Sequence, residues 1–210
     1  MKIAVLSAIL GNFDTPVDPP QQDIPFTFHR FTDKDFPPIA QWDPRLQYRI
    51  PKTHGWQMLP GYDAYVWLDG AMTLARPDSL SWLLGQMSIA EMLFFQHPYR
   101  ATVRQEVEHI DEHLRAGKPY ISARYKNGLH WDQLMLMDGD EPLYASTVFA
   151  YRNSPKVQEF LKDWWYYGSR YYTCDQVNLS YIIKKHKILH KVIHQNQYKC
   201  QYLKEASKHR

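Results

Sequence analysis

Apolar and polar residues alternate in blocks along the chain, and these blocks predict strands and helices in turn. Short, near-continuous apolar runs are typical of strands buried on both faces of a parallel sheet. Residues spaced three or four apart on one apolar face predict amphipathic helices. The predicted strands are residues 2–10, 26–33, 64–69, 91–98 and 142–153, with a short terminal strand within 188–198. The predicted helices are residues 76–87, 99–118, 154–168 and 175–187.

Local signals set several boundaries. Asp78 is expected to cap the helix that follows it, and Ser154-Pro155 is a typical helix start. Gly117 is expected to end the helix before it. Residues 35–60 are rich in proline and carry no clear period, so they are predicted to be irregular, with one helical turn around 44–48.

The alternation of strands and helices predicts an α/β fold, a three-layer sandwich around a mostly parallel sheet. There is no internal repeat and no low-complexity linker, and 210 residues suit one domain with a sizeable core. Two cysteines predict neither a disulfide framework nor a zinc site. No apolar run is long enough to predict a membrane span, and the first residues are interpreted as a strand of a cytoplasmic protein, in a bacterial or phage-infected cell.

Charge is distributed unevenly. Residues 184–210 contain eight Lys/Arg and one acid, a net charge of +7, while the rest of the chain has 17 basic and 21 acidic residues. A basic segment of this kind favours phosphate, in nucleic acid or a lipid headgroup, or is simply a solvated end. We therefore divide the chain into a main domain, 1–183, and a basic segment, 184–210, expected to pack on the same domain.

Candidate chemistry lies where predicted strands end, because ligands of open α/β sheets bind beyond the carboxyl ends of the strands. Asp69 follows a buried run at once, and Gly70 allows close backbone approach. A carboxylate there suits Mg²⁺ or Mn²⁺ on a diphosphate. Arg49 and Lys52, just upstream, suit phosphate oxygens. Each of these residues also fits an ordinary turn or a solvated loop.

Two further pairs fall between elements. His97 and Arg100 lie between a strand and a helix, where a phosphate or a sugar hydroxyl could meet a helix N-terminus. Asp175 and Gln176 are predicted to open a helix, where the acid caps the helix or accepts a proton from an attacking hydroxyl. His194 belongs to a set of histidines four residues apart, one of which could bind a metal. No P-loop, G-x-G-x-x-G or G-x-S-x-G motif occurs.

Five stretches, in order, resemble a glycosyltransferase-like family long catalogued as domain of unknown function 616. They are "KIAVLSAILGNFD", "FHRFTD", "PRLQYRIPKTHGWQMLPGYDAYVWLDGAMTL", "FFQHPYRATVRQEVEHI" and "YASTVFAYRNSPKVQEFLKDWWYYGSRYYTCDQVNLSYII". Together they run from about residue 2 to about residue 183. The resemblance implies a glycosyltransferase of the GT-A fold, which takes a nucleoside-diphosphate sugar as donor.

The resemblance also implies roles for individual residues. Asp69 becomes the metal or donor anchor, with Mn²⁺ or Mg²⁺ as cofactor. Because Ala71 offers no second carboxylate, His194 of the histidine set is our candidate for a second metal ligand, outside what the resemblance implies. The implied donor-binding residues are Ala8, Gly11, Arg49, Lys52, Asp69 and Gly70. His97, Arg100 and Gln176 become acceptor or sugar contacts, and Asp175 becomes the catalytic base. The chain departs from the family at two points: Ala71 stands where a second carboxylate is usual, and Cys174 replaces an arginine.

Three functions stay open from the sequence. A glycosyltransferase would act on a cell-surface glycan or its lipid-linked precursor, or on a hydroxymethylated base in DNA; the basic segment favours DNA or an anionic lipid carrier. The single carboxylate also permits a non-catalytic module that binds nucleotide or glycan. A nuclease is disfavoured because no clustered carboxylate motif occurs.

Overall fold

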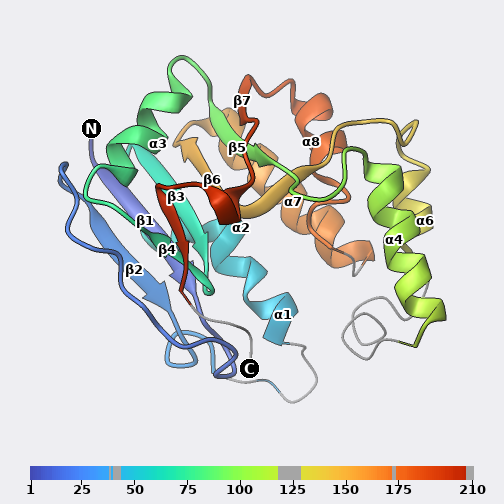
Figure 1. Cartoon of the computed structure of the whole chain (residues 1–210), viewed down its shortest axis with the longest axis horizontal. Helices are drawn as coiled ribbons and strands as arrows, with labels where there is room; N and C mark the ends of the chain where they lie inside the picture. The colour runs from blue at the N-terminus through green and yellow to red at the C-terminus, as the bar shows by residue number, and fades with distance from the viewer. Residues whose placement is uncertain (38, 40–43, 118–128, 172–173, 207–210) are drawn as a thin grey trace.

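The computed structural model of the chain describes residues 1–37, 39, 44–117, 129–171 and 174–206. Within these residues the strands form a six-stranded sheet and a two-stranded ribbon (Figure 1). The sheet strands, in spatial order, are β2 (Thr27–Phe31), β1 (Ile3–Ala8), β3 (Ala64–Asp69), β6 (Tyr144–Arg152), β5 (Met92–Gln96) and β7 (His190–Ile193). The ribbon pairs β4 (Met72–Leu74) with β8 (Leu203–Glu205).

The sheet is mostly parallel, as predicted. β1 runs parallel to both β2 and β3, and β5 runs parallel to β7. Within the described chain β6 alone is reversed, because it pairs antiparallel with β3 on one side and β5 on the other. The carboxyl ends of the other sheet strands therefore share one edge with the amino end of β6.

Alternate residues of each buried strand face opposite layers, which gives two cores. Leu6 and Trp67 point to one face, where they pack with residues of α7 (Pro155–Tyr171) and α8 (Leu179–His186). Val5 and Leu68 point to the other face, which is covered by α3 (Ser79–Met87) and the ribbon. The three-layer α/β sandwich predicted from the sequence is confirmed.

A third, smaller core lies at one end of the molecule, around α4 (Val103–Arg115) and α6 (Leu129–Leu134) (Figure 1). Thr102 and Gln105 form a capping box that starts α4, since each side chain binds the other residue's backbone N–H. Val107 and Ile110 lie on its buried face, so the predicted amphipathic helix is confirmed.

The helical turn predicted around residues 44–48 is confirmed as α1 (Pro44–Gln47). The irregular structure predicted for the residues that follow it is wrong, because they form a ten-residue helix, α2 (Arg49–Met58). Pro51 is tolerated because it lies in the first turn, where its missing N–H would have no helical partner. Gly55 lets the helix approach β1: a Cβ at this position would lie 2.3 Å from Leu6 Cδ1. Tertiary packing thus outweighs poor local helix propensity.

Two helix starts also differ from the prediction. Asp78 holds the N-cap position of α3, but its carboxylate binds Arg76 rather than the helix backbone. The Gln22 amide oxygen accepts the N–H of Leu80 instead. Asp175 does not open a helix, because residues 175–178 form a turn and α8 begins at Leu179.

The segment after residue 183 is built into the fold rather than appended to it. It contributes β7 to the main sheet, a short 3₁₀ helix, η1 (Gln197–Lys199), and β8 of the ribbon. None of the helices in the described ranges combines the length and apolar character needed to cross a membrane.

Candidate functional site

A cavity of about 500 Å³ opens at the edge of the sheet where β1 and β3 end. Its lining comes from segments far apart in the sequence: the residues after β1, the β3–β4 turn, the start of β6, the turn before α8, and the C-terminal segment. The described lining residues that carry polar or aromatic side chains are Phe13, Asp14, Tyr48, Asp69, Tyr99, Ser146, Thr147, Cys174, Asp175, Gln176, Tyr198 and Glu205. This is the position at which open α/β sheets bind ligands.

Lys52 lies behind this cavity and joins its two central carboxylates. Its Nζ lies 2.6 Å from Asp175 Oδ2 and 3.2 Å from Asp69 Oδ1, and its side chain is only 1% exposed. The ammonium also lies 5.5 Å from the ring centre of Tyr48 and 5.9 Å from those of Trp67 and Trp164. Aromatic faces attract a cation at such distances. The three rings and the two carboxylates therefore all stabilise the buried positive charge of Lys52.

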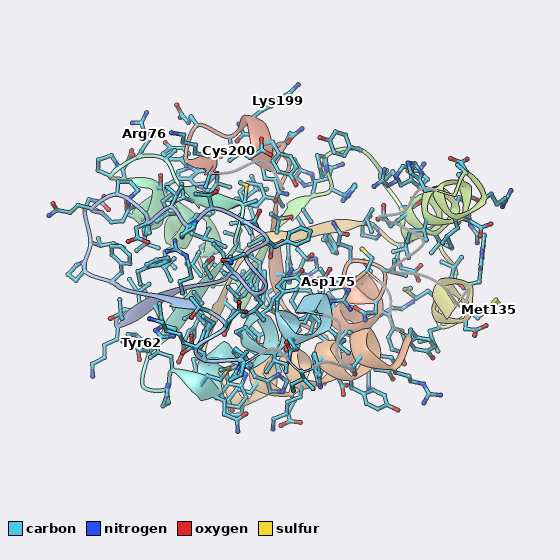
Figure 2. All side chains as sticks on the ribbon, turned by 90° about the horizontal axis from the view of Figure 1, so that it is seen from below. Tyr62, Arg76, Met135, Asp175, Lys199 and Cys200 are labelled. Atoms are coloured by element: carbon cyan, nitrogen blue, oxygen red, sulfur yellow. The ribbon has the colours of Figure 1, made fainter. Side chains whose placement is uncertain are left out.

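Each acidic residue of this triad has a second anchor, one through its side chain and one through its backbone. Trp67 donates its indole Nε1–H to Asp69 Oδ1 at 2.6 Å. Trp164 donates its Nε1–H to the backbone carbonyl of Asp175 at 2.8 Å, which fixes the turn before α8. Two tryptophans of the core therefore set the positions of the acids that face the cavity (Figure 2 labels Asp175 near the centre of the view).

Burial and charge shift the titration of this group. Burial alone would lower the pKa of Lys52, but Asp175 and Asp69 more than offset it and raise the pKa well above its usual value. Burial raises the pKa of Asp69, and the attraction of Lys52 opposes part of that rise. Burial, reinforced by Asp175, also raises the pKa of Tyr48. At neutral pH, Lys52 is therefore charged and Tyr48 is a neutral phenol.

A bulge in β6 brings further polar groups to the cavity. Phe94 pairs with Phe149, but the next residue of β5, Phe95, pairs with Ala145, so one step on β5 matches four on β6. The segment between these pairs turns toward the cavity, as bulges beside binding sites often do. Ser146 and Thr147 line the cavity from this segment, and Ser146 Oγ accepts from Lys52 Nζ at 3.4 Å.

The structure brings together five of the residues predicted from the sequence. Ala8, Asp69, Gly70, Asp175 and Gln176 line the cavity. Lys52 is adjacent but buried, so it contacts the two acids rather than a diphosphate.

Gly70 is explained by its neighbours: a Cβ there would lie 2.7 Å from Ile9 Cγ1 and 2.9 Å from both Ala8 O and Asp14 Oδ2. Its lack of a side chain thus allows the β3–β4 turn to pack on the residues that follow β1.

Three predicted donor or acceptor residues serve local structure. Gly11 is not among the described lining residues, and its N–H donates to Asp33 Oδ1 at 2.9 Å. Arg49 is buried, and its Nη1 donates to the Gly168 carbonyl at 3.4 Å. His97 Nδ1 accepts the backbone N–H of Arg100 at 3.1 Å, and burial lowers the pKa of His97 to about 4.

The Arg100 guanidinium pairs with Glu106, so it also stabilises the connection from β5 to α4. Tyr99, between His97 and Arg100, is the residue of this connection that lines the cavity.

The described side chains do not form a divalent-metal site from protein ligands alone. His194 follows β7, three strands from Asp69 in the sheet order, a separation of roughly 14 Å at normal strand spacing. Its Nδ1 hydrogen-bonds to Gln96 Oε1 instead. Nowhere in the described ranges do three His, Cys, Asp or Glu side chains gather closely enough to hold a metal ion. Asp69 Oδ1 is also already bound to Lys52 and Trp67.

Sequence reasoning missed Tyr99, Ser146, Thr147, Tyr198 and Glu205. Ser146 and Thr147 escaped because they lie near the beginning of a strand, and β6 is reversed. Tyr198 and Glu205 escaped because nothing local indicates that the C-terminal segment returns to β3. The only sequence feature that pointed to these residues was the high content of aromatic side chains. That feature does not show which of the aromatic residues line a binding site.

Comparison with known proteins gives a likeness of fold. No family model matches the chain, and no curated protein sequence is significantly similar to it. Among solved structures it is similar to the crystal structure of a glycosyltransferase involved in the glycosylation of the major capsid of PBCV-1. The match covers 91% of this chain and 82% of that one, with a TM-score of 0.50 and 9% sequence identity. The chain therefore has a glycosyltransferase-like fold.

Proposed function

We propose that this protein transfers a sugar from a nucleoside-diphosphate sugar to an acceptor hydroxyl. The observation that carries the proposal is the cavity at the carboxyl edge of the sheet, with Asp69 and Asp175 joined there through buried Lys52. The glycosyltransferase-like fold supports it. The ordered motifs that resemble the family catalogued as domain of unknown function 616 support it further.

In the proposed reaction Asp175 accepts the proton of the acceptor hydroxyl, as an inverting transfer requires. The acceptor oxygen forms a bond to the anomeric carbon of the donor sugar, while the bond from that carbon to the diphosphate oxygen breaks. The electron pair leaves with the nucleoside diphosphate. Lys52 holds the Asp175 carboxylate in place, and Asp69 hydrogen-bonds to hydroxyls of the donor. We assign no step to a divalent metal, because no three potential metal-binding side chains of the described residues lie together.

The test is a screen of nucleoside-diphosphate sugars, with Mn²⁺ and with EDTA, read by thermal shift and by release of the nucleoside diphosphate. A ligand that binds only the folded state must raise the melting temperature. We expect one donor to be bound and slowly hydrolysed, with the same thermal shift under both conditions. Asp175→Asn should lower transfer by about 10²- to 10⁴-fold, the usual contribution of a general base.

Asp78→Asn is the matched control, since Asp78 is an exposed carboxylate paired with Arg76 outside the cavity lining. Its rate should equal that of the wild type. If Asp175→Asn transfers sugar as fast as this control, Asp175 is not the base.

A non-catalytic binding module is the second candidate, favoured by the single carboxylate of the Asp69-Gly70-Ala71 turn. The same screen separates the two. A donor that raises the melting temperature but is never hydrolysed or transferred, with any acceptor tested, indicates the module.

A further inference from the structure

Exposed aromatic side chains gather at the cavity. Phe13, Tyr99 and Tyr198 are 36%, 72% and 43% exposed, and all three line it. Within the described ranges, two other aromatic residues, Trp131 and Tyr166, are comparably exposed, and neither is among the lining residues. Exposed apolar surface collected at one place marks a binding surface, whereas scattered single residues do not.

The two tyrosines are presented by separate segments and one of them is firmly held. Tyr99 belongs to the connection between β5 and α4, and Tyr198 belongs to η1. The Tyr198 phenol hydrogen-bonds to Thr147 of the β6 bulge, and its backbone N–H donates to Asn196 Oδ1 at 2.9 Å. Tyr99 and Asp69 line the same cavity as Tyr198.

The polar groups beside these rings suit hydroxyl groups. Asp69, Asp175 and Glu205 supply carboxylates, and Gln176 supplies an amide. Carboxylates accept hydrogen bonds from hydroxyl groups, and an amide both donates and accepts. No Lys or Arg is among the described lining residues, and Lys52 is sealed behind the acids. An aromatic face beside carboxylates and an amide matches a neutral, hydroxyl-rich ring.

None of the lysines that the structure describes in the basic segment lines the cavity. Lys184, Lys185 and Lys187 come just before β7, and β7 starts at the edge of the sheet opposite the cavity. Lys185 pairs with Asp163 of α7 at 2.7 Å. Lys199, next to Tyr198, projects outward from the molecule in Figure 2. Nucleic acid binding depends on cations that follow the phosphates, so this arrangement disfavours DNA as the acceptor.

We propose that Tyr99 and Tyr198 form an acceptor platform that stacks against the ring of a neutral sugar, so that the acceptor is a glycan. The polar face of the stacked sugar is turned toward Asp175 and Gln176, which brings one hydroxyl to the base. As an assignment of the acceptor, this inference rests on the proposed function. The binding of a neutral glycan at the two tyrosines is tested separately.

The experiment measures binding of the whole protein to an array of neutral oligosaccharides, followed by calorimetry with the best binder. A single-stranded DNA oligonucleotide is the competing probe. Tyr99→Ala and Tyr198→Ala should each weaken oligosaccharide binding by at least about 10-fold, in line with the loss of one stacked ring. Tyr99→Phe should stay within about 3-fold of the wild type because it keeps the ring face.

Tyr166→Ala is the matched control: it also removes an exposed tyrosine, but from α7 and outside the cavity lining, and it should leave binding unchanged. Circular dichroism of each variant checks that it is folded, and if one alanine variant is not folded, the other decides the matter. Failure of every neutral oligosaccharide to bind would overturn the inference. So would DNA binding that the tyrosine variants weaken.

The two proposals fail in different ways. If an oligosaccharide binds through the tyrosines but no nucleotide sugar is bound or hydrolysed, the glycan platform stands and the transferase does not. If a donor is hydrolysed but the tyrosine variants bind glycans as well as the wild type does, the platform is refuted and the transferase stands.

Discussion

Replacing Lys52 by methionine tests whether the buried ammonium holds the site together. The change keeps most of the apolar stem but removes the positive charge between Asp69 and Asp175, which lie 3.2 and 2.6 Å from it. Removing one partner of a buried ion pair typically costs 3–5 kcal/mol, about 3 here because the two acids keep 25% and 12% side-chain exposure. That loss lowers the folded-to-unfolded ratio by about 10²-fold.

Urea unfolding at neutral pH, followed by tryptophan fluorescence, measures the loss. Lys162→Met is the matched control, because Lys162 is half-exposed and pairs with Glu159 in the same helix. Surface pairs of this kind contribute well under about 1 kcal/mol. A Lys52→Met variant that loses no more stability than Lys162→Met would refute the structural role of the ammonium.

The pH dependence of the variant gives an independent check. Without the ammonium, the two neighbouring carboxylates raise each other's pKa, so the folded state binds a proton more tightly than the unfolded state. The stability that a raised carboxyl pKa provides is present at low pH and is lost as pH rises through the folded pKa. The penalty of Lys52→Met should therefore be smaller at about pH 5 than at about pH 8. An equal penalty at both would contradict this reasoning.

Three further predictions concern stability. Gly55→Ala should destabilise by about 1–2 kcal/mol, because its Cβ would press on a buried β1 leucine; Gly85→Ala, with open space around it, should stabilise by about 0.5–1 kcal/mol. Urea unfolding of the pair checks both signs. Burial lowers the pKa of His97 to about 4, so the free energy of unfolding should fall by about 2 kcal/mol as pH drops from about 6.5 to 4. In the His97→Gln variant, urea unfolding curves across this pH range should lack that part of the fall. A pH dependence equal to that of the wild type would contradict the assignment to His97. Trp67→Phe removes the hydrogen bond to Asp69 and should lower stability by about 1–2 kcal/mol in the same assay, whereas an undiminished stability would mean that the 2.6 Å contact contributes nothing.

The fold was largely predictable because its strands are buried on both faces. Runs such as residues 64–68 and 92–95 have no polar interruption, so they indicated buried strands without any tertiary information. Helix α2 was not predictable in the same way. Its proline and glycine argue against a helix locally, and the helix forms because Gly55 can approach Leu6.

The site was predictable where it follows a strand end or the start of a predicted helix. Asp69 was found by the first rule and Asp175 and Gln176 by the second, although the structure has a turn rather than a helix at Asp175. The partner of both acids, Lys52, was expected to bind phosphate, since its burial depends on a helix that the sequence did not reveal. Tyr198 reaches the cavity through the path of the C-terminal segment, which no local pattern encodes.

Ligand binding in the cavity should change the local stability of the ribbon formed by β4 and β8. The ribbon has three residue pairs, from Met72 with Glu205 to Leu74 with Leu203. These pairs connect the C-terminal segment, which forms part of the cavity wall, to the strand that follows the Asp69 turn. A two-stranded ribbon has little stability of its own, so its opening is expected to be among the easiest local fluctuations of the molecule. A ligand that touches both Asp69 and Glu205 must be released before the ribbon parts. Amide hydrogen exchange along β8 should therefore slow when a ligand binds in the cavity. The exchange rate of these backbone amides then reports the fraction of protein with ligand bound.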